Sequence, residues 1–271
     1  MTEAERLVLA VEIAREAGEM IRVARDQQTF GHRYKHGQEL VTDVDVAVDT
    51  HISERLEASF PGEARLSEEL APERDVLSDD APLWVVDPID GTVNFAHGLH
   101  HVAVSIAWAV AGQVRLGVVH APFLGETFTA LAGRGAQCNE RPIQASRSGN
   151  LEHCLVGTGF PYRRDSRPPL MRRLTAVLHH CQDVRRNGSA ALDLCDVACG
   201  RLDAYYESVS PWDFAAGWLI AREAGARTGH LYPPPTGFPE DLYGENLLVT
   251  SPGIHRELGE LLRRADAGEP G

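Results

Sequence analysis

The amino-acid sequence predicts an α/β protein in which helices alternate with strands and many of the strands are antiparallel. Apolar residues recur at helical spacing in several long segments, the first of which opens the chain. Short β-prone runs at 102–110, 114–120 and 126–131 are separated by turn residues, as in antiparallel hairpins. The 271 residues suffice for one large domain or two closely joined ones. We expect one compact unit made of two α/β halves, residues 1–146 and 147–271.

The first half is expected to open with two helices. The chain starts with the form of a capping box, and the apolar positions that follow predict a helix ending near Arg25. Residues 31–38 are polar and include two glycines, which is typical of a mobile loop. A second helix is expected at about 41–60. We attribute its acids Asp43 and Asp49 to a favourable interaction with the helix dipole.

Acidic side chains follow two predicted strands of this half. Residues 84–86 are apolar and β-prone, and they lead into Asp87 and then Asp90. Like-charged carboxylates held this close resist joint ionisation unless a cation lies between them, and a hard divalent ion, Mg²⁺ before Zn²⁺, suits oxygen ligands. Residues 64–69 repeat the layout with a short strand that runs into Glu68. The repetition suggests that both strand ends contribute to one site.

Strands and helices are expected to alternate in the second half. Residues 188–191 place backbone amides and a hydroxyl at a helix start, which is either an ordinary serine N-cap or a binding site for an anion or a hydroxyl. Asp213, near the start of another helix, is by default a cap. The expected strands lie at 154–159, 184–185, 202–207 and 247–250, and the expected helices at 169–181, 189–199, 211–224 and 253–264, before a loose tail.

Composition and charge exclude several classes of function. The net charge of −13 comes without the clustered Lys and Arg that a nucleic-acid surface needs to neutralise phosphates. The sequence shows no long uniform apolar segment or charged leader, so we expect neither export nor membrane insertion, and a cytoplasmic protein. The five cysteines are odd in number and scattered, which favours reduced thiols. We interpret Cys195 and Cys199 as small core residues rather than zinc ligands.

Three motifs follow one another along the chain: Glu68-Glu69, then Asp87-Pro88-Ile89-Asp90-Gly91-Thr92, then Trp212-Asp213-Phe214-Ala215-Ala216-Gly217. In order and approximate spacing they resemble the inositol monophosphatase family of Mg²⁺-dependent, lithium-sensitive phosphatases, over nearly the whole chain. The resemblance implies a layered αβαβα sandwich with mixed, largely antiparallel sheets, and a homodimer. It also implies that Asn94 and His97 brace the loop or line its rim, while His101 has no assigned role.

The resemblance further implies a site that holds two or three Mg²⁺ ions. The implied metal ligands are Glu68, Asp87, the Ile89 carbonyl, Asp90 and Asp213. Thr92, hydrogen-bonded to Asp45, would orient or deprotonate the attacking water, and Glu68 would hold the metal that activates this water. Lys35 would approach the phosphate or a further metal from its loop. The implied substrate contacts are Asp90, Gly91, Thr92, Gly188, Ser189, Ala190, Glu207 and Asp213.

The implied reaction is hydrolysis of myo-inositol monophosphate to inositol and phosphate. A carboxylate such as Glu207 can accept hydrogen bonds from the hydroxyls of a phosphorylated polyol. Fructose 1,6-bisphosphate, NADP and other small phosphate esters stay open as substrates, whereas the residues at 94–97 argue against histidinol phosphate and adenosine 3′,5′-bisphosphate. A regulatory binding protein with a vestigial phosphatase site is the alternative of another class. Vestigial sites usually lose a ligand, and none of the implied ligands is missing.

Overall fold

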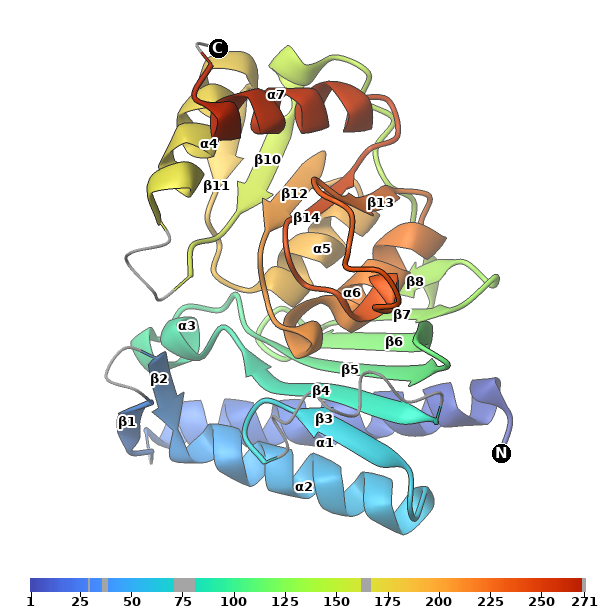
Figure 1. Cartoon of the computed structure of the whole chain (residues 1–271). Coiled ribbons are helices and arrows are strands. Elements are labelled where there is room, and N and C mark those ends of the chain that lie inside the picture. Colours follow the sequence, from blue (N-terminus) through green and yellow to red (C-terminus); the bar gives the residue numbers. More distant parts are fainter. Residues whose placement is uncertain (29, 36–38, 71–80, 162–166, 270–271) are drawn as a thin grey trace.

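The computed structural model describes residues 1–28, 30–35, 39–70, 81–161 and 167–269, and for residues 35 and 39 it describes the backbone alone. Helices and sheets alternate in layers, with helices on both outer faces and a third helix layer between the two sheets (Figure 1). This arrangement confirms the predicted αβαβα sandwich. Within the described residues, no helix combines the length and the apolar character needed to cross a bilayer.

The helices form three layers, and the last two layers do not follow the order of the chain. The first outer layer consists of α1 (Glu3–Gln27) and α2 (Asp43–Ser59). The central layer consists of α5 (Ala190–Ala198) and α6 (Pro211–Glu223), and the second outer layer of α4 (Arg167–His180) and α7 (His255–Ala267). The predicted capping box at Thr2 is present, because Thr2 accepts from the Glu5 amide and Glu5 accepts from the Thr2 amide.

The first sheet has seven strands in the order in which they occur along the chain. Its first two strands are parallel and the remaining neighbours are antiparallel, as the hairpin pattern predicted. Parallel strands end at the same edge, so Glu68 comes to lie beside Asp87. The strands are β3 (Ala64–Ser67), β4 (Leu83–Asp90), β5 (Ala103–Val110), β6 (Gln113–Ala121), β7 (Glu126–Leu131), β8 (Ala136–Cys138) and β9 (Arg141–Pro142).

The second sheet has five strands in the order β11-β10-β12-β14-β13. Its parallel pairs are β10 with β11 and β10 with β12, and β14 runs antiparallel to β12 and β13. The strands are β10 (Leu155–Thr158), β11 (Asp183–Arg185), β12 (Ala204–Glu207), β13 (Arg227–His230) and β14 (Leu247–Thr250). The sequence did not predict β13, because its four residues carry no apolar alternation.

Several local elements differ from the expectations. Of the loop expected at 31–38, residues 36–38 lie outside the described residues. Residues His32–Lys35 form β1, which pairs antiparallel with β2 (Glu39–Thr42), so backbone pairing orders these four residues although their side chains are polar. A short helix, α3 (Thr92–His97), follows β4 and is too brief to show helical periodicity. Short 3-10 turns occur at Leu151–His153 and Glu240–Leu242. The last helix extends to Ala267, into the segment expected to be a loose tail.

The largest hydrophobic cluster lies between the two sheets and includes side chains from both halves, such as Phe128 and Trp218. Helix α6 lies so close to the first sheet that a Cβ on Gly117 of β6 would be 2.7 Å from the Ala216 carbonyl oxygen. The absence of a side chain at Gly117 permits this approach. The five cysteines are unpaired, and Cys195 is buried in this cluster as predicted. The division at residues 146 and 147 stays a prediction, since one core joins the two halves.

Candidate active site

A cleft of about 770 Å³ opens where the ends of β3, β4 and β12 meet the starts of α3, α5 and α6. It brings together most of the residues singled out from the sequence. Asp45 is buried beneath the cleft, and the Lys35 side chain lies outside what the structure describes. The predicted residues that line the cleft are Glu68, Asp87, Ile89, Asp90, Gly91, Thr92, Gly188, Ser189, Ala190, Glu207 and Asp213.

Three carboxylates from two elements converge in this cleft. One oxygen each of Asp87, Asp90 and Asp213 lies within 4.8 Å of the others. Burial raises the pKa of Asp87 well above its usual range, and the negative charges of Glu68, Asp90 and Asp213 add to the effect. The donor set consists of carboxylate oxygens, which hard divalent cations such as Mg²⁺ prefer. The residues present therefore fit a Mg²⁺ site, because a cation would relieve the repulsion among them.

The carboxylate of Asp90 is oriented by the second half of the chain. Its Oδ2 accepts hydrogen bonds from the Ser189 hydroxyl at 2.6 Å and from the Ala191 amide at 2.7 Å. Burial raises the pKa of Asp90 to about 6, although these two donors favour the ionised form. Ser189 also accepts from the Leu192 amide at 3.3 Å, so it is the N-cap of α5 and donates its proton to Asp90.

Asp213 combines two roles that the sequence presented as alternatives. It occupies the third position of α6, where its Oδ2 accepts from the Ser210 amide at 2.7 Å in a capping box. The same carboxylate belongs to the cluster with Asp87 and Asp90. A helix cap and a place among the candidate metal ligands are therefore compatible for this residue.

Thr92 and Asp45 form the hydrogen bond expected of them. The Thr92 hydroxyl lies 2.9 Å from Asp45 Oδ1 and 3.0 Å from the Ile89 carbonyl oxygen, so its single proton is shared between these acceptors. Asp45 Oδ2 accepts from the amide and the hydroxyl of Thr42 at 2.8 and 2.5 Å. Burial raises the pKa of Asp45 despite these donors. The Thr92 oxygen keeps lone pairs for a donor in the cleft.

Glu207 closes the end of β12 inside the same cleft. It accepts a short hydrogen bond from the Tyr205 hydroxyl. Burial raises the pKa of Glu207 to about 8, against the opposing effects of Tyr205 and the nearby Arg186 guanidinium. A Cβ on Gly159 would come within 2.3 Å of its carboxyl group, so any larger residue there would displace the Glu207 side chain from this position.

The turn between β4 and α3 depends on glycine. Gly91 has φ +96°, and a Cβ there would lie 2.8 Å from the His101 carbonyl oxygen. Asn94 confirms the expected brace, because its Nδ2 donates to the carbonyl oxygens of His101 and Asn187, both at 2.8 Å. His97 is exposed at the end of α3.

The attribution of Asp49 to the helix dipole is wrong. Asp49 lies beyond the first turn of α2 and is fully buried, and its Oδ2 accepts from the Ser67 hydroxyl at 2.8 Å and from the Leu70 and Glu69 amides at 3.0 and 3.2 Å. It therefore holds the segment that carries Glu68. Its spacing from Ile52, on the apolar face of the helix, is the signal that identifies a buried acid.

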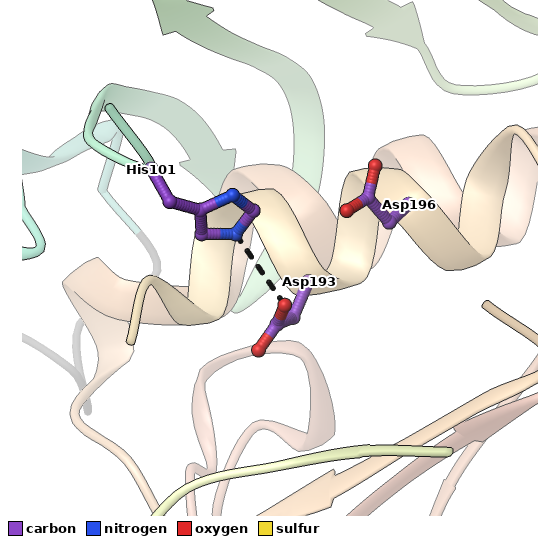
Figure 2. A group of neighbouring side chains, drawn as sticks. All are labelled: His101, Asp193 and Asp196. Carbon is purple, nitrogen blue, oxygen red and sulfur yellow. Dashed lines mark ion pairs between the residues drawn. The ribbon is translucent and has the colours of Figure 1, made fainter. Parts of the chain in front are cut away.

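Sequence reasoning also missed residues whose partners lie far along the chain. Arg186 and Asp193 line the cleft, although neither belongs to a motif. His101, which had no assigned role, faces Asp193 and Asp196 on α5 (Figure 2). Its Nε2 lies 3.4 Å from Asp193 Oδ1, and Asp196 is paired with Arg201 at 3.1 Å. Burial lowers the pKa of His101, but these carboxylates outweigh it and the net pKa is raised.

Comparisons with known proteins agree with this geometry. A sequence model of the inositol monophosphatase family matches residues 3–266. The chain is 36% identical over 260 residues to the Nus factor SuhB of Pasteurella multocida, with 93% of each chain covered. It is 42% identical over 229 residues to the inositol-1-monophosphatase of a Synechocystis species, with 83% of this chain and 77% of that protein covered. The crystal structure of the suppressor protein SuhB from Bartonella henselae superposes with a TM-score of 0.87 at 31% identity, covering 96% of this chain and 99% of that chain.

Proposed function

This chain belongs to the inositol monophosphatase family, a family of metal-dependent phosphatases, and we propose that it hydrolyses myo-inositol monophosphate to inositol and phosphate with Mg²⁺. The observation that carries the proposal is the convergence of Asp87, Asp90 and Asp213, with one oxygen of each within 4.8 Å of the others. The cleft that they line also contains Glu68 and the Thr92 hydroxyl. Such a set suits a reaction that needs charge neutralisation and a positioned water rather than a covalent intermediate.

The metal would be held by the carboxylates already described. The proposed ligands are Glu68, Asp87, the Ile89 carbonyl, Asp90 and Asp213, and the proposed number of ions is two or three. Bound Mg²⁺ lowers the pKa of a coordinated water and neutralises charge on the phosphate. The Ile89 carbonyl keeps one lone pair when Thr92 donates to it, so its hydrogen bond leaves room for a metal.

The protein side chains would position and deprotonate the attacking water. Thr92 accepts a hydrogen bond from the water while its own proton points to Asp45. As the water attacks phosphorus, its proton passes to the Thr92 oxygen and the Thr92 proton passes to Asp45. The raised pKa of Asp45 makes this carboxylate a better proton acceptor than an exposed aspartate. In the proposed pose, the amides of Gly91 and Thr92 hold phosphate oxygens.

The preference for a polyol rests on further residues of the same cleft. We assign the ring hydroxyls to Gly188, Ala190 and Glu207, which line the cleft together with the carboxylate cluster. Because the pKa of Glu207 is about 8, its carboxyl group is largely protonated at pH 7 and can both donate to and accept from a hydroxyl. The name of the Synechocystis relative supports inositol 1-phosphate as the first substrate to test.

The first experiment is Mg²⁺-dependent phosphate release from a panel of esters, with and without lithium. The panel consists of myo-inositol 1-phosphate, fructose 1,6-bisphosphate, adenosine 3′,5′-bisphosphate, NADP and histidinol phosphate. A clear preference for inositol 1-phosphate would support the proposal, and lithium inhibition would extend the family resemblance. Preference for another ester would retain the metal site but overturn the assignment of Glu207 to inositol hydroxyls.

A point mutation tests the carboxylate cluster itself. We expect Asp90→Asn to lower phosphatase activity by about 100-fold or more, because the charge that balances the metal is lost. The matched control is Asp43→Asn, which changes an exposed aspartate on α2 and should keep activity within about twofold. Circular dichroism would check that both variants keep the fold. An active, folded Asp90→Asn protein would contradict the metal site.

The second candidate is a binding role of another class. It is favoured by one observation, the name Nus factor carried by the Pasteurella multocida relative. The panel separates the two candidates, because a binding protein with a vestigial site would release no phosphate from any ester at saturating Mg²⁺. Turnover of any panel member would remove the vestigial-site candidate. We propose a homodimer for either candidate, and sedimentation would test it.

A further inference from the structure

Asp193 contributes a carboxylate to the cleft that the proposed mechanism does not use. It lies in the first turn of α5, one turn beyond Ser189 and therefore on the same side of the helix. Its side chain is 2% exposed, and the little surface that remains lines the cleft. A nearly buried acid at this place requires an explanation, because burying a charge without partners is costly.

The two oxygens of Asp193 have different surroundings. Oδ1 accepts from Asn187 Nδ2 at 2.7 Å and lies 3.4 Å from His101 Nε2. Oδ2 receives no hydrogen bond from any described residue, and Figure 2 shows one oxygen directed toward His101 and the other directed away from His101 and Asp196. In the described part of the chain, three side-chain polar atoms are fully buried without a hydrogen-bond partner, and all three belong to other residues. Oδ2 is therefore not fully buried. Its open side is therefore the cleft.

A purely structural role accounts for Oδ1 of Asp193 but not for Oδ2. An acid in a first helical turn interacts favourably with the helix dipole, and Oδ1 holds Asn187, whose carbonyl in turn accepts from Asn94. An asparagine could serve the same brace through its carbonyl oxygen. Neither role requires a second, charged oxygen that faces a cleft. Ionised carboxylates accept hydrogen bonds and donate none, so the missing partner of Oδ2 is a donor.

The neighbours of Asp193 indicate which kind of hydrogen-bond donor Oδ2 would bind. The charge of Asp193 raises the pKa of Glu207 and of Tyr205, so Asp193 and Glu207 act on the same part of the cleft. Asp90, on the metal side, is also within electrostatic reach of Asp193. The Arg186 guanidinium also lines this part of the cleft and offsets some of its negative charge, while neutral hydroxyls would find two acceptors in Asp193 and Glu207.

We propose that Asp193 Oδ2 accepts a hydrogen bond from a ring hydroxyl of the substrate, and that with Glu207 it selects phosphate esters of polyols over those of simple alcohols. This inference rests on the proposed function, because it concerns the substrate of the same cleft. Asp193 is on this view a specificity residue, and it takes no part in the proton transfers at Thr92. The ring need only present a hydroxyl to α5 while its phosphate lies at the carboxylate cluster.

The test compares two esters that share a six-membered ring. Cyclohexyl phosphate has the ring without the hydroxyls of myo-inositol 1-phosphate, so the ratio of the two kcat/KM values reports what the ring hydroxyls contribute, and the change of this ratio in a variant cancels the different leaving-group strengths of the two alcohols. We expect the wild-type protein to favour the inositol ester by at least 10-fold, because a site built to bind a hydroxyl rejects an analogue that lacks it. Equal kcat/KM values for the two esters would overturn the proposal without any variant.

Asp193→Asn changes mainly the atom that faces the cleft. Its carbonyl can still accept from Asn187, which leaves an NH₂ group in the place of Oδ2. We expect kcat/KM for the inositol ester to fall about 10-fold, chiefly through KM, and the value for cyclohexyl phosphate to change by less than about threefold. The control is Asn187→Ala, which removes the donor to Oδ1 and leaves Oδ2 in place. It should change both esters by the same factor.

The outcomes separate this inference from the proposed function. An equal loss on both esters in Asp193→Asn would show that Asp193 only braces α5, and the inference would be wrong while the phosphatase stands. A wild-type protein that hydrolyses neither the two ring esters nor the panel esters would overturn the proposed function, and this inference with it. Urea unfolding of each variant would show whether a loss of activity comes from unfolded protein instead.

Discussion

The Ser189 hydroxyl donates a hydrogen bond of 2.6 Å to Asp90 Oδ2 across 99 positions of the sequence. Asp90 ends β4 in the first half of the chain, and Ser189 caps α5 in the second. The Ala191 amide adds a second donor to the same oxygen. A candidate metal ligand of one half is thus oriented by a helix of the other, so the cleft requires both halves to be assembled.

Removing this hydroxyl should weaken metal binding. We expect Ser189→Ala to raise the Mg²⁺ concentration needed for half-maximal activity about 10-fold or more, because groups that orient a metal ligand typically contribute this much to affinity. Phosphate release measured over a Mg²⁺ titration checks it. Ser189→Thr is the control, since it keeps a hydroxyl at the helix N-cap. The hypothesis fails if Ser189→Ala shows the wild-type Mg²⁺ dependence.

Thr92 should affect the rate of reaction more than metal binding. Thr92→Val removes the hydroxyl that donates to Asp45 and keeps the shape of the side chain. We expect kcat to fall by about 100-fold or more, as for the loss of a proton-transfer group, with little change in Mg²⁺ dependence. Thr92→Ser retains the hydroxyl and should keep most of the activity. A Thr92→Val enzyme with wild-type kcat would remove Thr92 from the mechanism.

Asp49 should support both the fold and the position of Glu68. Asp49→Ala leaves the Ser67 hydroxyl and two backbone amides without their acceptor, so we expect the free energy of unfolding to fall by about 2 to 3 kcal/mol. Chemical denaturation at pH 7 measures it. Asp43→Ala on the same helix is the comparison, because Asp43 is exposed and should lose less than about 1 kcal/mol. Equal losses would return Asp49 to the helix-dipole role.

The parts of this structure that were predictable are those set by neighbouring residues. The Thr2 capping box, the hairpins β5 to β7 and the strand before Asp87 all follow from patterns within a few positions. Asp87 and Asp90 were predictable because Asp-Pro-Ile-Asp-Gly-Thr occupies one continuous segment, whereas the role of Asp213 as a candidate ligand came from the family resemblance. The layered fold came from the family resemblance, since local pattern alone indicated only a mixed α/β protein.

The residues that were missed have distant or backbone partners. The local sequence attributes Asp49 to the helix dipole, because its partner Ser67 belongs to a separate element, β3. Asp193 and His101 belong to different halves, and no local pattern brings them together. The pairing of β1 with β2 depends on backbone hydrogen bonds, which polar side chains do not reveal. In each case the decisive contact forms only when separate elements pack.

Glu207 gives the metal-free protein a distinct dependence of stability on pH. Its pKa is about 8 in the folded protein, against 4.5 for an ordinary glutamate, so the folded state holds a proton that the unfolded state has lost between these values. This contribution to stability is present below about pH 4.5 and is lost as the pH rises to 8.

Glu207→Gln cannot lose a proton, and its amide oxygen can still accept from Tyr205. Between pH 5 and 8 we therefore expect the free energy of unfolding of Glu207→Gln, relative to that of the wild type, to increase by up to about 1.4 kcal/mol per pH unit. Urea unfolding in the presence of a chelator measures both proteins, and comparing them cancels the titration of Asp90, whose pKa is also raised. Curves that stay parallel across this range would mean that Glu207 is ionised in the folded protein at neutral pH.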